Sequence, residues 1–74
     1  MSKTTTTPEK SSDMARRLAD AAGQVRRHIE ADPRLPPAYI ASARARLDVL
    51  QTEARRMLVE CRAYEAAAVA AELR

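Results

Sequence analysis

Three prolines within five residues constrain this chain more than any other feature. They lie in the segment ADPRLPPAY, at Pro33, Pro36 and Pro37. A proline lacks the backbone N–H that a helix interior needs and clashes with the preceding turn, so we expect no helix to run through this segment. Pro37 can still open a new helix, because the first helical residue does not use its N–H. The break is short and carries no Gly/Ser linker, which favours a bend between antiparallel helices over a joint between independent pieces.

The residues before the prolines predict one amphipathic helix over about residues 12–31. Its apolar residues recur at three- and four-residue spacings and therefore share one face. The preceding residues, 1–11, are rich in Thr and Ser, and we expect them to form a disordered tail. Gly23 lies in the middle of the helix, where it either permits close approach of a second helix or is only a weak spot.

The residues after the prolines predict a longer helix, over about 38–73. Its apolar or small residues alternate at spacings of three and four without a slip, which is the a/d pattern of a coiled coil. These residues are Ile40, Ala43, Leu47, Leu50, Ala54, Met57, Cys61, Tyr64, Ala68 and Ala71.

The predicted fold is therefore all-α: an antiparallel helical hairpin over residues 12–74, with a turn at 32–37 and a longer second helix of coiled-coil character. Its expected core is Met14, Leu18, Val25, Ile29, Ile40, Leu47 and Leu50.

The unequal helix lengths predict an uncovered surface. A first helix of about 20 residues, or ~30 Å, covers the second helix only to about Met57. An apolar strip without an intrachain partner is typical of an interaction surface, although fraying of the alanine-rich end is the alternative. The predicted partner-binding residues are Met57, Leu58, Cys61, Tyr64, Ala68 and Ala71.

Several kinds of chemistry find no support in the sequence. One cysteine, Cys61, excludes an intrachain disulfide, and Cys61 with the one histidine, His28, cannot supply a four-ligand zinc site. No nucleophile motif or glycine-rich phosphate loop occurs, so we expect no enzyme, small-molecule substrate, cofactor or metal. No apolar run approaches the ~18 residues that span a bilayer. We therefore expect no membrane insertion. A lone free cysteine is typical of a reducing compartment, so we expect a cytoplasmic protein.

The basic charge raises the alternative of nucleic-acid binding. The net charge is +3, with 13 Lys and Arg against 10 Asp and Glu. Within the two predicted helices, acids lie four residues from five of the eleven arginines, so no clean basic stripe forms and ion pairs along each helix are expected. These pairs are Asp13–Arg17, Arg16–Asp20, Arg26–Glu30, Arg44–Asp48 and Arg56–Glu60. Nucleic acid is thus an unlikely partner, and a small basic nucleic-acid-associated or mobile-element regulatory protein is kept as the alternative function.

A protein partner is the first hypothesis. The charges on the second helix restrict how two copies of that helix could pair. A parallel homodimer of the second helix would set Glu60 against Glu65 of the other chain, which is repulsive. An antiparallel homo-oligomer and a second protein both stay open.

The stretches MARRLADAAGQVRRHIE, ADPRLPPAY and ARLDVLQTEARRML lie within about residues 14–64. Their arrangement resembles the small helical co-chaperones of type III secretion needle proteins. The shared features are a polar N-terminus, a short first helix, an Asp-Pro turn, and a tyrosine at the start of a longer helix. The Thr-rich tail, the extra prolines and the alanine-rich end depart from that family. The resemblance implies a cytoplasmic interaction module that pairs with a second chaperone to hold a needle subunit.

Overall fold

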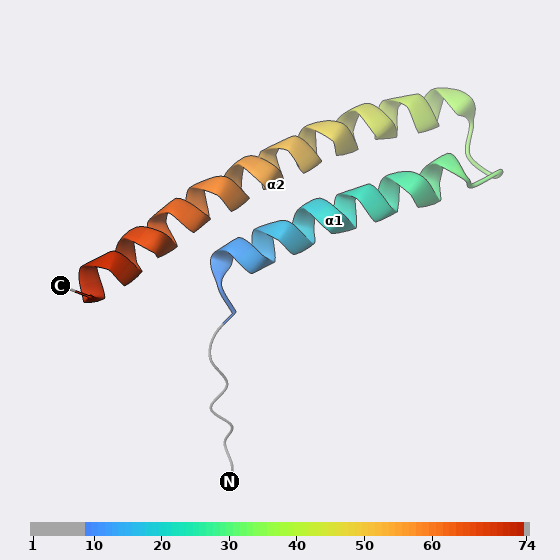
Figure 1. Cartoon of the computed structure of the whole chain (residues 1–74). Coiled ribbons are helices and arrows are strands. Elements are labelled where there is room, and N and C mark those ends of the chain that lie inside the picture. The colour runs from blue at the N-terminus through green and yellow to red at the C-terminus, as the bar shows by residue number, and fades with distance from the viewer. Residues whose placement is uncertain (1–8, 74) are drawn as a thin grey trace, which may run out of the picture.

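The chain folds as an antiparallel hairpin of two helices (Figure 1). A computed structural model describes residues 9–73, and the predicted tail falls largely outside this range. Helix α1 is Ser11–Glu30 and helix α2 is Pro37–Glu72, of 20 and 36 residues. Residues 9–73 contain no strand, so the all-α hairpin with a longer second helix is confirmed.

The turn between the helices is closed by one aspartate. The carboxylate of Asp32 accepts hydrogen bonds from the backbone N and the Nε of Arg34, both at 3.0 Å. These bonds hold the pKa of Asp32 below its ordinary value, the side-chain bond being the larger cause. Pro36 is extended, with φ −65° and ψ 146°, and Pro37 opens α2. The proline segment thus makes the bend that the sequence predicts.

Small side chains line the contact between the helices. We call this line the contact seam; on α1 it consists of Ser12, Ala15, Ala19, Ala22, Arg26 and Ile29, and on α2 of Ile40, Ala43, Leu47, Gln51, Ala54, Leu58, Cys61 and Glu65. The buried hydrophobic residues are alanines, and Ala54 has no exposed surface. Within residues 9–73 no large side chain is fully buried. The core of this hairpin is therefore narrow.

The predicted core needs correction at four positions. Ile29, Ile40 and Leu47 are half-buried in the contact seam as expected. The exposed fractions of the other four side chains run from 39 to 58%. These residues are Met14, Leu18, Val25 and Leu50. The reason is steric: alanines at the centre of the seam leave room only for close backbone approach, and the larger side chains lie beside it.

The contact seam also drifts along α2 relative to the heptad stripe. Beyond Leu47 it passes through Gln51, Leu58 and Glu65, each one residue after an expected position. A straight helix drifts by about 20° per heptad from the 3.5-residue repeat, whereas an 11-residue repeat follows it more closely. Ala43, Ala54 and Glu65 recur at that 11-residue spacing. The large apolar residues of the heptad pattern, such as Leu50 and Met57, therefore lie beside the contact seam and not in it.

Candidate interaction surface

One side of the hairpin is joined by ion pairs between the helices. Arg26 Nη1 lies 2.6 Å from Asp48 Oδ1, and Arg44 Nε lies 2.8 Å from Glu30 Oε2. The sequence predicts these same four charges to pair along each helix, as Arg26–Glu30 and Arg44–Asp48. The structure corrects this expectation, because the partners are exchanged across the hairpin. These pairs make this side of the hairpin polar, although exposed ion pairs of this kind contribute little to stability.

Gln51 reinforces this polar side from within the contact seam. Its Nε2 donates a hydrogen bond to the carbonyl oxygen of Ala19 at 2.9 Å. A Cβ at position 23 would lie 3.0 Å from that same nitrogen. Of the two interpretations of Gly23, close approach is the one that the structure supports: the absent side chain leaves space for the amide of Gln51.

The opposite side of the contact seam is apolar and open. We call it the apolar face; it consists of Met14, Leu18 and Val25 on α1 and Leu50, Met57 and Tyr64 on α2, and all six side chains are exposed. An open groove of about 440 Å³ lies within it, lined by Ser11, Met14, Ala15, Leu18, Met57 and Cys61. The groove shows that the apolar residues of the two helices lie side by side. The hairpin is therefore amphipathic as a whole, with one polar and one apolar side.

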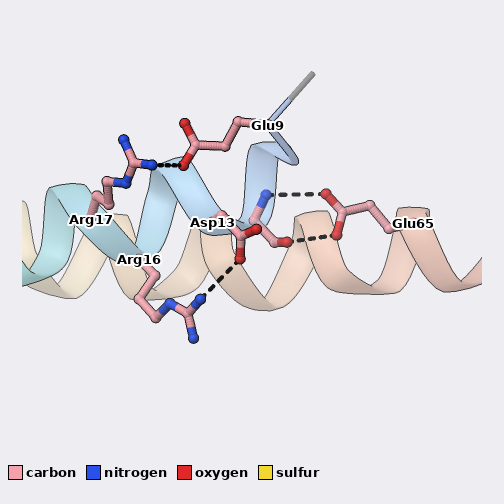
Figure 2. Close-up of polar contacts among 6 residues, drawn as sticks. Glu9, Asp13, Arg16, Arg17 and Glu65 are labelled. Carbon is pink, nitrogen blue, oxygen red and sulfur yellow. Dashed lines mark hydrogen bonds and ion pairs between the residues drawn. The ribbon is translucent and has the colours of Figure 1, made fainter. Parts of the chain in front are cut away.

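The start of α1 is fastened to α2 by Glu65 (Figure 2). Its carboxylate accepts hydrogen bonds from the backbone N of Ser12 at 3.1 Å and from the Oγ of Ser12 at 2.6 Å. These bonds, the side-chain one first, lower the pKa of Glu65 from its ordinary value. Lys10 occupies the N-cap position and makes no side-chain capping bond. Glu65 thus satisfies a free N–H at the start of α1 in place of a local capping side chain.

This contact changes where the uncovered part of α2 begins. The helix lengths predict that α1 covers α2 only to about Met57, but α1 reaches Glu65, about two turns farther. Leu58 and Cys61 are consequently half-buried in the contact seam, and Met57 is exposed on the apolar face. Only the end of α2, from Ala66 to Glu72, extends beyond the start of α1 (Figure 1).

The six predicted partner-binding residues therefore fall into three environments. Met57 and Tyr64 belong to the apolar face, and Tyr64 is 79% exposed. Leu58 and Cys61 pack in the contact seam, and Cys61 also lines the groove of the apolar face. Ala68 and Ala71 are exposed on the projecting end of α2. The periodic pattern does not reveal four further surface residues, because large apolar side chains at such spacings usually indicate a core. These residues are Met14, Leu18, Val25 and Leu50.

The other ion pairs also join arginines to nearby acids. Arg17 pairs with Glu9, and Arg16 Nη2 lies 2.9 Å from Asp13 (Figure 2). Arg56 lies 3.9 Å from Glu53 rather than beside Glu60. Arginine and acid thus remain neighbours on both helices, although the particular partners differ from those predicted.

The described residues offer no group of three or more His, Cys, Asp or Glu side chains that could hold a metal ion. Neither α1 nor α2 combines the length and the apolar character that crossing a bilayer requires. No family model, curated protein or solved structure matches this chain. The fold therefore defines the class, an all-α helical hairpin with one apolar side.

Proposed function

We propose that this protein is a small protein–protein interaction module that binds through its apolar face. One observation carries the proposal: the small side chains are buried and the large apolar side chains are exposed, which is the reverse of the usual arrangement. Alanines occupy the centre of the contact seam, while Met14, Leu18 and Met57 lie exposed beside it. Contiguous exposed apolar surface of this kind is typical of interaction sites, because its burial by a partner removes it from water.

The projecting end of α2 extends the proposed surface. Tyr64 leads from the apolar face onto the exposed segment Ala66–Glu72, which includes Val69. A helical hairpin that presents adjacent rows of apolar residues can receive an amphipathic helix, whose own apolar side then completes the packing.

A narrower role as a co-chaperone for a type III secretion needle subunit remains a proposal that rests on the architectural resemblance alone. The nucleic-acid alternative has less support. Arg16, Arg26 and Arg44 each lie within 3.0 Å of an acid, so a phosphate would have to displace an existing partner.

The proposal is tested by affinity capture with a matched pair of variants. Met57→Asp places a charge on the apolar face, and Val59→Asp places the same charge on an exposed valine of the same helix outside that face. Both variants are first checked for retained helicity by circular dichroism. We expect the tagged wild type and Val59→Asp to retain the same protein from an extract of the producing cells, and Met57→Asp to lose it. Identical capture by all three proteins, or loss with Val59→Asp instead, would contradict the proposal.

A further inference from the structure

We propose that the occupant of the apolar face is a second copy of this chain, an inference that rests on the proposed function. The two hairpins stack face to face about a twofold axis parallel to the helices. Helix α1 of each copy then lies antiparallel on α2 of the other, and the product is a four-helix bundle whose inner layer is the two apolar faces.

The charges that border the apolar face carry this inference. On α1, Arg17 and Gln24 are seven residues apart and flank Met14, Leu18 and Val25 on the side away from α2. On α2, Glu53 and Glu60 are also seven residues apart and flank Leu50 and Met57 on the side away from α1. The apolar face therefore has one edge with a basic and an amide side chain and one edge with two acids.

A twofold axis parallel to the helices brings these two edges together. Such an axis leaves each residue at the same height along the helices. It places the α1 edge of one copy against the α2 edge of the other. Leu18 and Met57 line one groove and so lie at the same level. Arg17, which pairs with Glu9 within the hairpin, then exchanges that partner for Glu60 of the second copy, and Gln24 meets Glu53. Each contact occurs twice in the dimer, which makes the edges complementary.

The other antiparallel arrangement is less favourable. Turning the second copy end for end lays α2 on α2 and sets the acidic edge with Glu53 and Glu60 against itself. The arrangement that we propose places Arg46 near His28 toward the turn, but it keeps Glu53 and Glu60 away from the same acids of the second copy.

The size of the apolar face indicates a reversible dimer. Leu50 to Tyr64 spans ~21 Å of helix, and two helices are about 20 Å wide, so the footprint is modest. Interfaces at the small end of the range belong to weak and transient complexes. We therefore expect monomer and dimer to exchange with concentration.

The test is a charge exchange read by sedimentation equilibrium of the full chain. Arg17 and Glu60 lie on opposite edges of one hairpin, so a rescue of one substitution by the other must act between copies. We expect a wild-type dimer, about tenfold weaker dimerisation in Arg17→Glu and in Glu60→Arg, and recovery to within about threefold of wild type in the double variant. Arg55→Glu changes the same charge on α2 outside these edges and should leave dimerisation unchanged. Circular dichroism verifies that each variant is folded.

Three results would overturn the second-copy proposal: a wild type that stays monomeric at millimolar concentration, single reversals without effect, and a double variant that does not recover. These failures are distinguishable from failure of the proposed function. A monomeric wild type whose capture of another protein is lost with Met57→Asp leaves the interaction surface standing and assigns it a different partner. A monomeric wild type with no Met57-dependent capture removes both.

Discussion

The carboxylate of Glu65, late in α2, caps the start of α1 by accepting two hydrogen bonds from Ser12, at 3.1 and 2.6 Å. The residues are 53 apart in sequence. The negative charge lies where the helix macrodipole is positive, so the contact is favourable both as a hydrogen bond and as an electrostatic interaction. It determines how far the two helices run together and therefore how much of α2 projects.

The first prediction concerns the loss of this cap. Glu65→Ala removes both acceptors, and we expect hydrogen exchange at the amides of Met14 and Ala15 to accelerate by about fivefold, the size of a lost N-cap. Glu72→Ala, at the exposed end of α2, is the matched control and should leave those amides unchanged. Equal protection in Glu65→Ala and wild type would show that the contact does not hold the start of α1.

The second prediction is a pH dependence. The folded state lowers the pKa of Glu65 from its unfolded value near 4.5, so its contribution to stability is present above that value and is lost as the pH falls through the lower folded value. We expect the melting temperature of wild type to fall relative to Glu65→Gln on acidification from pH 6 to pH 3. Because the other carboxylates, including Asp32, are common to both proteins, the difference isolates Glu65. Parallel pH profiles would be inconsistent with this prediction.

The third prediction uses the space beside Gly23. Alanine in place of a mid-helix glycine stabilises a helix by ~1 kcal/mol when nothing obstructs it. In the native chain the new Cβ would lie 3.0 Å from Gln51 Nε2, so we expect Gly23→Ala to gain clearly less than that. In a Gln51→Ala background the full gain should appear. Urea denaturation of the four proteins of this double-mutant cycle measures the coupling, and strict additivity would refute it.

The fourth prediction tests the alanine core. Ala54 has no exposed surface, and we expect Ala54→Leu to destabilise the hairpin by ~1–3 kcal/mol because the helices must separate. Ala63→Leu makes the same change at an exposed position of α2 and should be nearly neutral. Thermal unfolding compares the two. An Ala54→Leu variant as stable as Ala63→Leu would mean that the helices do not pack closely there.

The elements were predictable from local sequence, whereas the contact between them was not. Pro33, Pro36 and Pro37 act on their own backbone and immediate neighbours, so the bend follows from the sequence directly. Which residues face one another depends on the spacing of the helix axes, which alanines set and periodicity alone does not reveal. Leu50 and Leu58 illustrate this: the first was expected in the core and is 41% exposed, while the second was expected at the surface and is half-buried.

The candidate surface was predicted in part for the same reason. Met57 and Tyr64 are exposed as the sequence predicts, but Met57 is exposed because it lies beside the contact seam and not because α1 ends there. The bond between Glu65 and Ser12, and the exchange of ion-pair partners between Arg26 and Arg44, depend on which side chains meet across the hairpin. Sequence spacing within one helix carries no information about such meetings.

The central claim is that two copies of this chain associate through the apolar face, and backbone amide NMR over a dilution series tests it most directly. Concentration-dependent chemical shift changes should cluster at the amides around Leu18, Val25, Leu50 and Met57, with little change at Glu30 and Arg44 on the polar side. Changes centred on Glu30 and Arg44 would contradict the account. So would spectra identical from micromolar to millimolar concentration.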